Sequence, residues 1–368
     1  MTRLISLAAL LALAVAPLAA QDKAKPDDKP PEPALQKQYA ELQKEFNAAM
    51  RKKLEAAKDD AEREAVFQNL SVVGAPFADK AVKLAQDNVK DPAALGPLTF
   101  ALIVGRSEKA ADLVVDSFQD HKDLPAVCLE LAANAPDNPA IESLLKKLSE
   151  KATDRKVKGA ALFAVATILL SQSDGALDLK KSEALVSEAE KNANAVSKEY
   201  ADLDGPGEKL GEAAKKILVQ IKKFAVGRAA PEVVSRDLDG KEVKLSAQKG
   251  KVVVLDIWAT WCPPCKAMIP HERKMAERLK DKPFQLISIS ADEEVETLKK
   301  FLEGERMPWV HWFEGQRKGG ILNDWAVHAF PTIYVLDTKG VIRYKQIGGG
   351  TSNLEKAVDM LVKETEKK

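Results

Sequence analysis

The residues with the most evident chemistry in this chain are the two cysteines of the run Trp261-Cys262-Pro263-Pro264-Cys265. The run follows an apolar segment predicted to be a buried strand and opens a segment predicted to be a helix. At a helix N-terminus, unpaired N–H groups and the helix dipole stabilise a thiolate and lower its pKa. We therefore expect Cys262 to be the nucleophile of a thiol–disulfide exchange and Cys265, one turn later, to resolve the mixed disulfide.

The composition of the motif favours redox chemistry over metal binding. Pro263 and Pro264 fix the backbone between the sulfurs and withhold two N–H donors, and Pro263 is tolerated because it begins the helix. The alternative is half of a structural zinc site, which needs four ligands, or three and a water. With 3 Cys and 4 His, the sequence has no second Cys-x-x-Cys and no His pair at ligand spacing. We expect no metal, and no cofactor beyond a redox-active Cys262–Cys265 disulfide.

The segments around the motif predict an α/β domain. Residues 251–257 and 284–290 are near-continuous apolar runs, typical of strands in a sheet covered on both faces. Asp239-Gly240 lies between two alternating segments, which predicts a hairpin. We expect a central mixed sheet with helices on both faces; its other strands are expected at 309–313, 332–337 and 341–346, and its helices at 263–279, 295–303, 322–327 and 353–363.

At this point a family resemblance is visible. The segment GKVVVLDIWATWCPPCKAMIP resembles the active-site segment of the thioredoxin superfamily, and in particular its exported TlpA-like branch, which includes the ResA and DsbE types. GRAAPEVVSRDLDGKEVKLS resembles the opening hairpin of that branch. The resemblance covers about residues 226–366. It implies a thioredoxin-like fold and an exported thiol–disulfide oxidoreductase that exchanges disulfides with protein clients, with reduction of those clients as the favoured direction.

The resemblance also implies roles for residues outside the motif. Asp256 matches the buried carboxylate of thioredoxins, whose proposed role is to accept the proton of Cys265; a desolvated carboxyl has a raised pKa suited to that task. An Asp paired with a Lys is the alternative. Pro331 matches the cis-proline loop that faces the cysteines, and it leaves the backbone of Phe330 free to pair with an extended substrate.

Three further positions match structural parts of the family pattern, and one departs from it. Pro270 matches the kink in the active-site helix. Trp261 is expected to flank the exposed sulfur and help dock the substrate, whereas Trp258 is expected in the core. Met268 stands where many TlpA-like proteins have a Glu that tunes the thiols. We therefore expect the acid–base work to fall more heavily on Asp256.

The N-terminus has the pattern of an export signal. Arg3 is followed by an apolar run over residues 4–16 and by Pro17-Leu18-Ala19-Ala20. This order predicts a signal peptide at 1–20, cleaved after Ala20, and a periplasmic location. An uncleaved membrane anchor is the alternative. Residues 21–34 are rich in Lys, Asp and Pro and predict a disordered linker.

Residues 35–225 predict a separate α-helical domain. The region has no Trp and is rich in Ala, Leu, Lys and Glu, and a faint repeat joins Lys90 to Lys122. Asp91-Pro92 and Asn138-Pro139 place a capping side chain before a Pro at a helix start. No residue here identifies a ligand, so an unknown protein partner, dimerisation and spacing from a membrane all remain open. Helices are expected at 35–57, 77–89, 93–104, 107–119, 124–134, 139–152, 156–172, 180–197 and 208–224, and the thioredoxin-like domain at 226–368.

Composition limits the other classes of function. The net charge is +1, from 56 Lys+Arg and 55 Asp+Glu, which argues against a nucleic-acid binder that relies on a basic face. The remaining cysteine, Cys128, lies in an apolar helical segment and is expected to be structural. We expect protein thiols and disulfides as partners, together with a membrane electron-transfer partner. Two alternatives stay open: a partner-binding scaffold with a thioredoxin-like docking module, and a thiol peroxidase.

Overall fold

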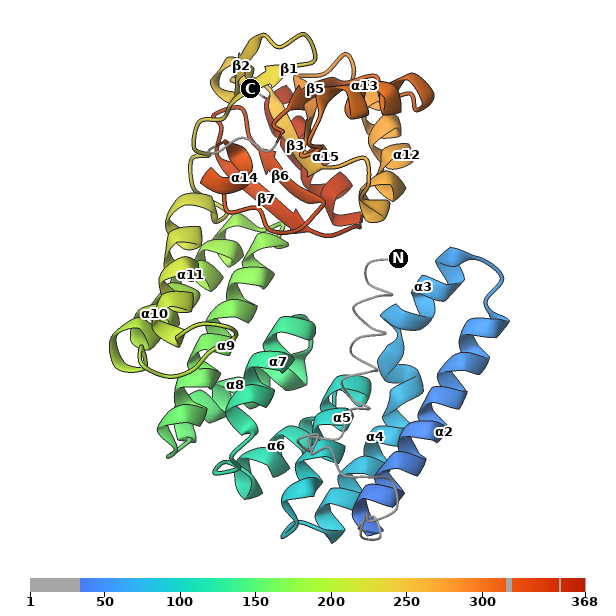
Figure 1. Ribbon diagram of the computed structural model, residues 1–368, viewed down its shortest axis with the longest axis vertical. Coiled ribbons are helices and arrows are strands. Elements are labelled where there is room, and N and C mark those ends of the chain that lie inside the picture. The colour runs from blue at the N-terminus through green and yellow to red at the C-terminus, as the bar shows by residue number, and fades with distance from the viewer. Residues whose placement is uncertain (1–33, 316–319, 351, 368) are drawn as a thin grey trace. The chain divides into compact units, whose positions relative to one another are not determined.

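The computed structural model describes residues 34–315, 320–350 and 352–367, and the described chain before residue 225 consists of helices joined by turns and loops (Figure 1). The predicted signal peptide and all but the last residue of the predicted linker lie outside these residues. Asp91 and Asn138 cap helices with their side chains, as expected. The helices are α2 (Ala34–Ala56), α3 (Asp60–Gln68), α4 (Leu70–Asp87), η1 (Pro92–Ala94), α5 (Leu95–Gly105), α6 (Glu108–Ser117), α7 (Leu124–Asn134), α8 (Pro139–Lys151), α9 (Arg155–Asp174), α10 (Leu179–Glu199) and α11 (Leu210–Phe224).

The prediction was wrong for residues 60–76, where α3 was missed and α4 begins at Leu70. Asp59 caps α3 by accepting a hydrogen bond from the Glu62 N–H at 2.8 Å. Pro76 lies inside α4, where a Pro costs a hydrogen bond. Gly74 serves packing: a Cβ there would lie 1.9 Å from the carbonyl oxygen of Val104, so α4 and α5 approach closely only because it is Gly. Tertiary contact thus overrides a local helix-breaking pattern.

The chain forms two compact units, and the division falls within helices. One unit holds Leu169–Lys191 and Lys215–Lys368, so it contains the sheet and parts of α9, α10 and α11. The other holds the helices up to Ile168 and residues Asn192–Ala214. The domain boundary expected between residues 225 and 226 stays a prediction.

The sheet is mixed and seven-stranded, with the order β2-β1-β5-β4-β3-β6-β7. The strands β3, β4 and β5 run parallel, while β6 pairs antiparallel with β3 and β7 antiparallel with β6. The expected hairpin is formed by β1 and β2. The elements are β1 (Val234–Asp237), β2 (Glu242–Lys244), η2 (Leu245–Gln248), β3 (Val252–Trp258), α12 (Pro263–Arg278), β4 (Phe284–Ser290), α13 (Val295–Gly304), β5 (Val310–Phe313), α14 (Ile321–Asp324), β6 (Thr332–Leu336), β7 (Ile342–Ile347) and α15 (Ser352–Glu366).

The central strand β3 is buried on both faces, as its apolar run predicts. Val253, Leu255 and Ile257 face a core that includes Trp312 and Trp325. Alternate residues point to the other face, where Val252 and Val254 pack against α12 and α15. Asp256 continues this second row. The alternation of the strand therefore aims a carboxyl at the face that α12 covers.

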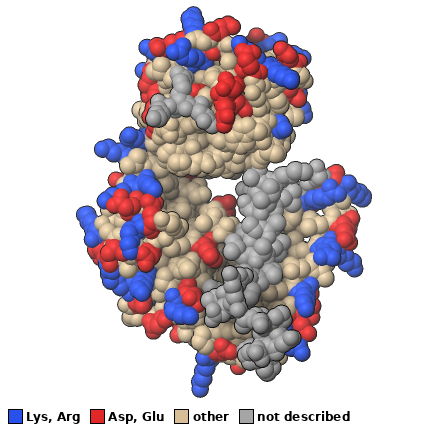
Figure 2. Space-filling model, viewed as in Figure 1, with Lys and Arg blue, Asp and Glu red and all other residues tan. Residues whose placement is uncertain are grey.

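Charged side chains of both signs are interspersed over the face seen in Figure 2, in keeping with the near-zero net charge. Within the described residues, none of the helices combines the length and apolar character needed to cross a membrane.

Candidate active site

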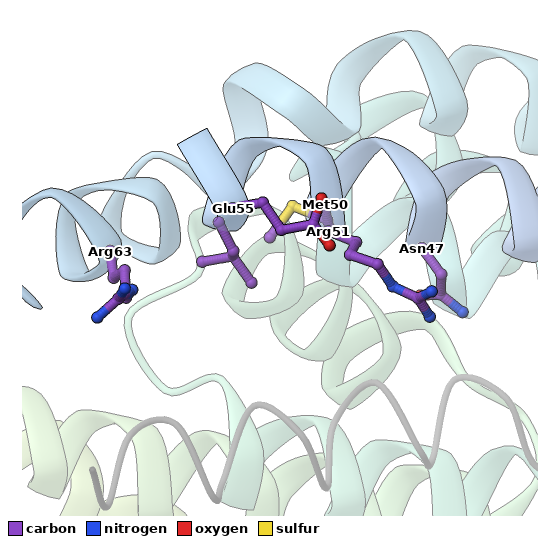
Figure 3. Close-up of a pocket in the computed structure, with 6 residues that line it drawn as sticks. Asn47, Met50, Arg51, Glu55 and Arg63 are labelled. Carbon is purple, nitrogen blue, oxygen red and sulfur yellow. The ribbon is translucent and has the colours of Figure 1, made fainter. Parts of the chain in front are cut away.

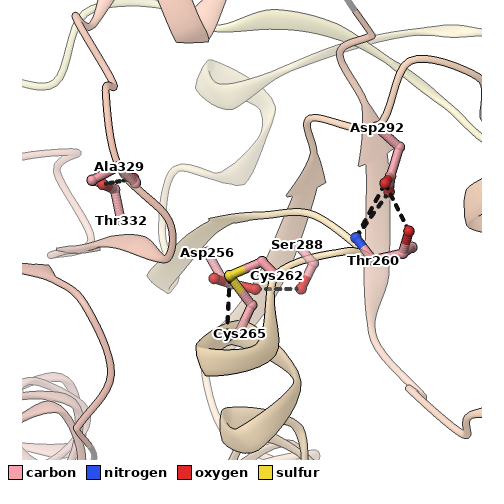
Figure 4. Close-up of a disulfide and its surroundings, with 8 residues drawn as sticks. All are labelled: Asp256, Thr260, Cys262, Cys265, Ser288, Asp292, Ala329 and Thr332. Carbon is pink, nitrogen blue, oxygen red and sulfur yellow. Dashed lines mark hydrogen bonds between the residues drawn. A yellow bond between two sulfur atoms is a disulfide. The ribbon is translucent and has the colours of Figure 1, made fainter. Parts of the chain in front are cut away.

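A disulfide joins Cys262 and Cys265 at the N-terminus of α12 (Figure 4). Cys262 is the N-cap residue, and its sulfur accepts a hydrogen bond from the N–H of Cys265 at 3.3 Å. Pro263 and Pro264 occupy the first two helical positions and have no N–H to donate. Both cysteines are 3% exposed. The N-terminal position of the pair is the one that the sequence predicts.

The loop before the cysteines is fastened by Asp292. The N–H of Thr260 donates to Asp292 at 3.1 Å, and the Thr260 hydroxyl donates at 2.8 Å (Figure 4). Ser290 also donates to Asp292, at 2.7 Å, and the carboxylate is buried. Sequence reasoning missed Asp292. The sequence could have indicated Asp292 by its position just after the strand β4. Because β4 runs parallel to β3, a polar residue there lies next to the loop that follows β3 and leads to the cysteines.

Asp256 is buried, and among the described residues its hydrogen-bond partner is Ser288 rather than a Lys. It is one of the residues drawn around the disulfide in Figure 4, and Ser288 donates to its Oδ2 at 3.1 Å. The Ser288 hydroxyl in turn accepts from Trp309 Nε1 at 2.8 Å. Burial raises the pKa of Asp256 from 3.8 to about 7, and the Ser288 hydrogen bond opposes that rise. A carboxyl with this pKa can take up or release a proton near neutral pH.

A second buried carboxyl, Glu272, lies on α12 and was missed by sequence reasoning. It is 2% exposed, and burial, followed by the charge of Asp256, raises its pKa well above 4.5. The signal was present in the spacing: Glu272 lies one helical turn after Met268 and two turns after Cys265, on one stripe of the helix. Met268 itself is buried in the core, as an apolar residue at that position would be.

The peptide bond between Phe330 and Pro331 is cis, and it lies just before β6. The Thr332 hydroxyl donates to the Ala329 carbonyl at 2.8 Å and closes this loop (Figure 4). Phe330 packs against the apolar cluster that contains both cysteines. Trp261 is 62% exposed and meets Phe330 edge to face, with ring centroids 5.6 Å apart. An exposed aromatic surface thus lies beside the disulfide.

Trp258, Pro270 and Cys128 lie within helices or the packed core. Trp258 is 1% exposed and packs edge to face on Phe301. Pro270 lies inside α12. Cys128 is buried and unpaired in α7, and burial raises the pKa of its thiol to about 12, which makes it a poor nucleophile.

No group of three or more His, Cys, Asp or Glu side chains within the described residues could hold a metal ion. A surface cavity of about 520 Å³ lies in the helical unit (Figure 3). Its lining has two arginines and one carboxylate and neither Cys nor His: Asn47, Met50, Arg51, Leu54, Glu55 and Arg63.

Comparison with known proteins agrees with this geometry. The Redoxin family matches residues 225–361. Thiol-disulfide oxidoreductase ResA of Bacillus anthracis is 34% identical over 131 residues, which cover 35% of this chain and 73% of that protein. The C-terminal part of this chain belongs to the ResA-like thiol-disulfide oxidoreductase family. Thioredoxin-like protein YneN of Bacillus subtilis (strain 168), another relative, is 31% identical over 138 residues, 36% of this chain and 79% of that protein.

Solved structures of similar proteins cover the same share of the chain. The thioredoxin domain of a thiol-disulfide oxidoreductase from Bacteroides vulgatus is 30% identical, with a TM-score of 0.35, over 38% of this chain and 99% of that one. The expected thioredoxin-like fold and thiol–disulfide oxidoreductase class of this ResA-like domain are confirmed. The family match begins at residue 225 and therefore leaves out the helical region.

Proposed function

We propose that this chain is an exported oxidoreductase that reduces disulfides of client proteins through Cys262 and Cys265. One arrangement supports this function above all: the cysteine pair lies at the start of α12, and the buried Asp256 is among the residues around it (Figure 4). A nucleophile, a resolving thiol and a proton acceptor are the groups that the exchange requires. The redox-active disulfide is then the only cofactor-like group used.

In the first step the Cys262 thiolate, its proton already lost to water, attacks a client disulfide. A bond forms between the Cys262 sulfur and one client sulfur, and the other client sulfur leaves and takes a proton from water. Cys265 then passes its proton to Asp256 and attacks Cys262, which forms the enzyme disulfide and releases the first client sulfur. That sulfur takes the proton from Asp256. The client gains two electrons and two protons, and the enzyme loses them.

The two prolines favour the reducing direction. A dithiol is a weaker reductant when the protein stabilises its thiolate. Because Pro263 and Pro264 lack N–H groups, the Cys265 N–H is the donor to the Cys262 sulfur within the first turn. The buried Asp256 also disfavours a second negative charge nearby. Both features leave the thiolate less stabilised, and the disulfide form is favoured.

The surface beside the disulfide suits an extended client segment. Trp261 and Phe330 offer aromatic contact, and in this proposal the backbone of Phe330 pairs with a strand of the client. In this proposal Trp258, Pro263, Pro264 and Pro270 shape the site without touching the client. A membrane donor of electrons would return the enzyme to the dithiol form, and the helical region would serve an unidentified protein partner.

Equilibration of the full chain with dithiothreitol buffers tests the direction. A reduction potential of about −270 mV would support the proposal that the protein reduces its clients. A potential of about −120 mV would instead make the protein a disulfide donor. Cys262→Ser is expected to abolish dithiol-dependent reduction of insulin, and full activity of that variant would refute the proposal. Fractionation of cells of the source organism tests export, which depends on the sequence pattern of residues 1–20.

A further inference from the structure

The inner face of α12 carries a carboxyl in an otherwise apolar row. Cys265, Met268, Glu272 and Met275 recur at the spacing of one helix face, and all four are buried. Met268 and Met275 pack on Val252 and Val254 of β3. On the same side of that strand the next residue in line is Asp256. Helix and strand thus present one carboxyl each to a shared interior.

Glu272 has little to compensate its burial. Its Oε1 is shielded from solvent and has no hydrogen-bond partner among the described residues. An isolated buried carboxylate is costly, so the group must stay protonated or share its charge. A carboxyl buried within a packed helix face is therefore a polar feature of an otherwise apolar core that needs an explanation.

Asp256 is the ionisable group that faces Glu272. The neighbouring charged residues on α12 point outward: His271 lies 4.0 Å from Glu355, and Arg273 pairs with Glu305. From β4 the polar group is the uncharged Ser288, which is bonded to Asp256. The side chains that β6, β7 and α15 add to this core are apolar except for Tyr344, whose hydroxyl donates to Gln346: Ile333, Val335, Tyr344, Leu354, Ala357, Val358, Leu361 and Val362.

We propose that Glu272 is a positioning residue for the exchange: with Asp256 it forms a buried carboxyl pair that carries a single negative charge behind the Cys262–Cys265 disulfide. This inference rests on the proposed function. Two like charges in a shared apolar interior do not ionise together at neutral pH. Asp256 ionises first and serves as the base for Cys265, while Glu272 stays neutral. The charge of Asp256 adds to burial in raising the pKa of Glu272.

The pairing predicts how each carboxyl titrates in the variants. Full chain labelled with ¹³C at Asp and Glu carboxyls, in the disulfide form, is titrated by NMR. In wild type, two ionisation steps belong to the pair, one near neutral and one at higher pH. Glu272→Gln is expected to remove the upper step. Asp256→Asn is expected to move the ionisation of Glu272 to lower pH, because the neighbouring charge is gone. An unchanged Glu272 titration in Asp256→Asn would overturn the pairing.

The rate at which Cys265 resolves a mixed disulfide tests the consequence for the exchange. Wild type is expected to show both inflections against pH, and Glu272→Gln only the lower one. Glu272→Met, with the carboxyl removed, is expected to match Glu272→Gln. The swap Met268→Glu/Glu272→Met returns a carboxyl to the same helix face and is expected to restore the upper inflection. Profiles of wild type and Glu272→Gln that coincide would overturn the positioning role.

Failure of the proposed function would look different. Wild type would then reduce no insulin at any pH, while the NMR titrations of the two carboxyls would still be coupled. Loss of folding in a variant is detected by the same NMR spectra, and Glu272→Met and Glu272→Gln give two independent routes to a folded protein without the carboxyl.

Discussion

Ser288 and Asp256 lie directly opposite each other on the parallel strands β3 and β4, and the Ser288 hydroxyl donates to the Asp256 carboxyl at 3.1 Å. The same hydroxyl accepts from Trp309 Nε1. A hydrogen bond to an ionised carboxylate favours that form. Ser288 therefore limits the rise in the pKa of Asp256 that burial causes.

Ser288→Ala is expected to raise the pKa of Asp256 further, because the charged form loses its donor. The lower inflection of the pH–rate profile for the Cys265 step should move upward by roughly one pH unit, the size expected for a hydrogen bond to a charged group. Stopped-flow measurement of mixed-disulfide resolution checks this. Ser182→Ala is the matched control, since that hydroxyl is equally buried and donates to the Ser173 carbonyl. A downward shift would contradict the prediction.

The raised pKa of Asp256 predicts how stability depends on pH. Its value in the folded protein, about 7, exceeds the ordinary 3.8, so between these values the native state binds more protons than the unfolded chain. Stability contributed by the protonated form is therefore lost as pH rises through this window. Asp256→Asn is expected to remove the loss and to stabilise the disulfide form at pH 8 by up to roughly 4 kcal/mol relative to wild type.

Denaturant unfolding of wild type and Asp256→Asn, with the disulfide intact, measures this difference. The gap between the two free energies of unfolding should be small near pH 4 and widen up to pH 8. Glu272 is present in both proteins. The difference between their free energies of unfolding therefore reports the ionisation of Asp256 together with its coupling to Glu272. A gap that stays constant with pH would rule out a raised pKa.

Trp261→Ala is expected to weaken client docking and leave the chemistry intact. The side chain is 62% exposed and contacts Phe330, so its loss removes apolar surface next to the disulfide. The KM for insulin should rise several-fold, since the loss of one aromatic contact costs on the order of 1 kcal/mol. The rate with a small aromatic disulfide should stay close to wild type. Val234→Ala, which also removes an exposed apolar side chain, is the control and should change neither.

A buried ion pair within the sheet unit predicts strong, non-additive effects on stability. Lys345 of β7 lies 3.1 Å from Asp174 at the end of α9, and its ammonium lies 5.7 Å from the centroid of the Tyr334 ring. Asp174→Asn or Lys345→Met alone is expected to cost about 3–5 kcal/mol, because an unpaired charge is left buried. The double variant should cost less than either single variant. Thermal unfolding checks this, and simple additivity of the two single effects would contradict it.

The sequence predicted best those elements whose local pattern and environment agree. The strand at residues 284–290 has its predicted limits, and α12 starts at Pro263 as expected. The local sequence determines both elements: a fully buried strand has a continuous apolar run, and a Pro fits the first position of a helix. Asp256 was predicted from the resemblance of the segment around the cysteines to the thioredoxin superfamily. Its partner Ser288 could not be predicted, because register between strands is set by the whole sheet.

The features that the sequence did not predict also depend on contacts between elements. Gly74 and Pro76 suggest a break, and only the contact of α4 with α5 shows why the helix continues. Glu272 was not predicted, because the family pattern has a carboxyl at the position of Met268, one helical turn earlier. The helical periodicity indicates its burial: Glu272 lies one turn from a buried apolar residue on either side, and a carboxyl between two such residues is expected to face the core.

The compact unit that holds the sheet extends beyond the residues that the Redoxin family matches. Phe224 of α11 packs on Trp325, with ring centroids 5.6 Å apart, and Asp174 neutralises the buried ammonium of Lys345. A genetic recombination that replaced the coding region upstream of residue 225 would remove both partners at once. The helical residues that share this unit with the sheet are therefore not interchangeable with an unrelated segment. Over evolution, these helical residues and the sheet are expected to be inherited, altered or lost together.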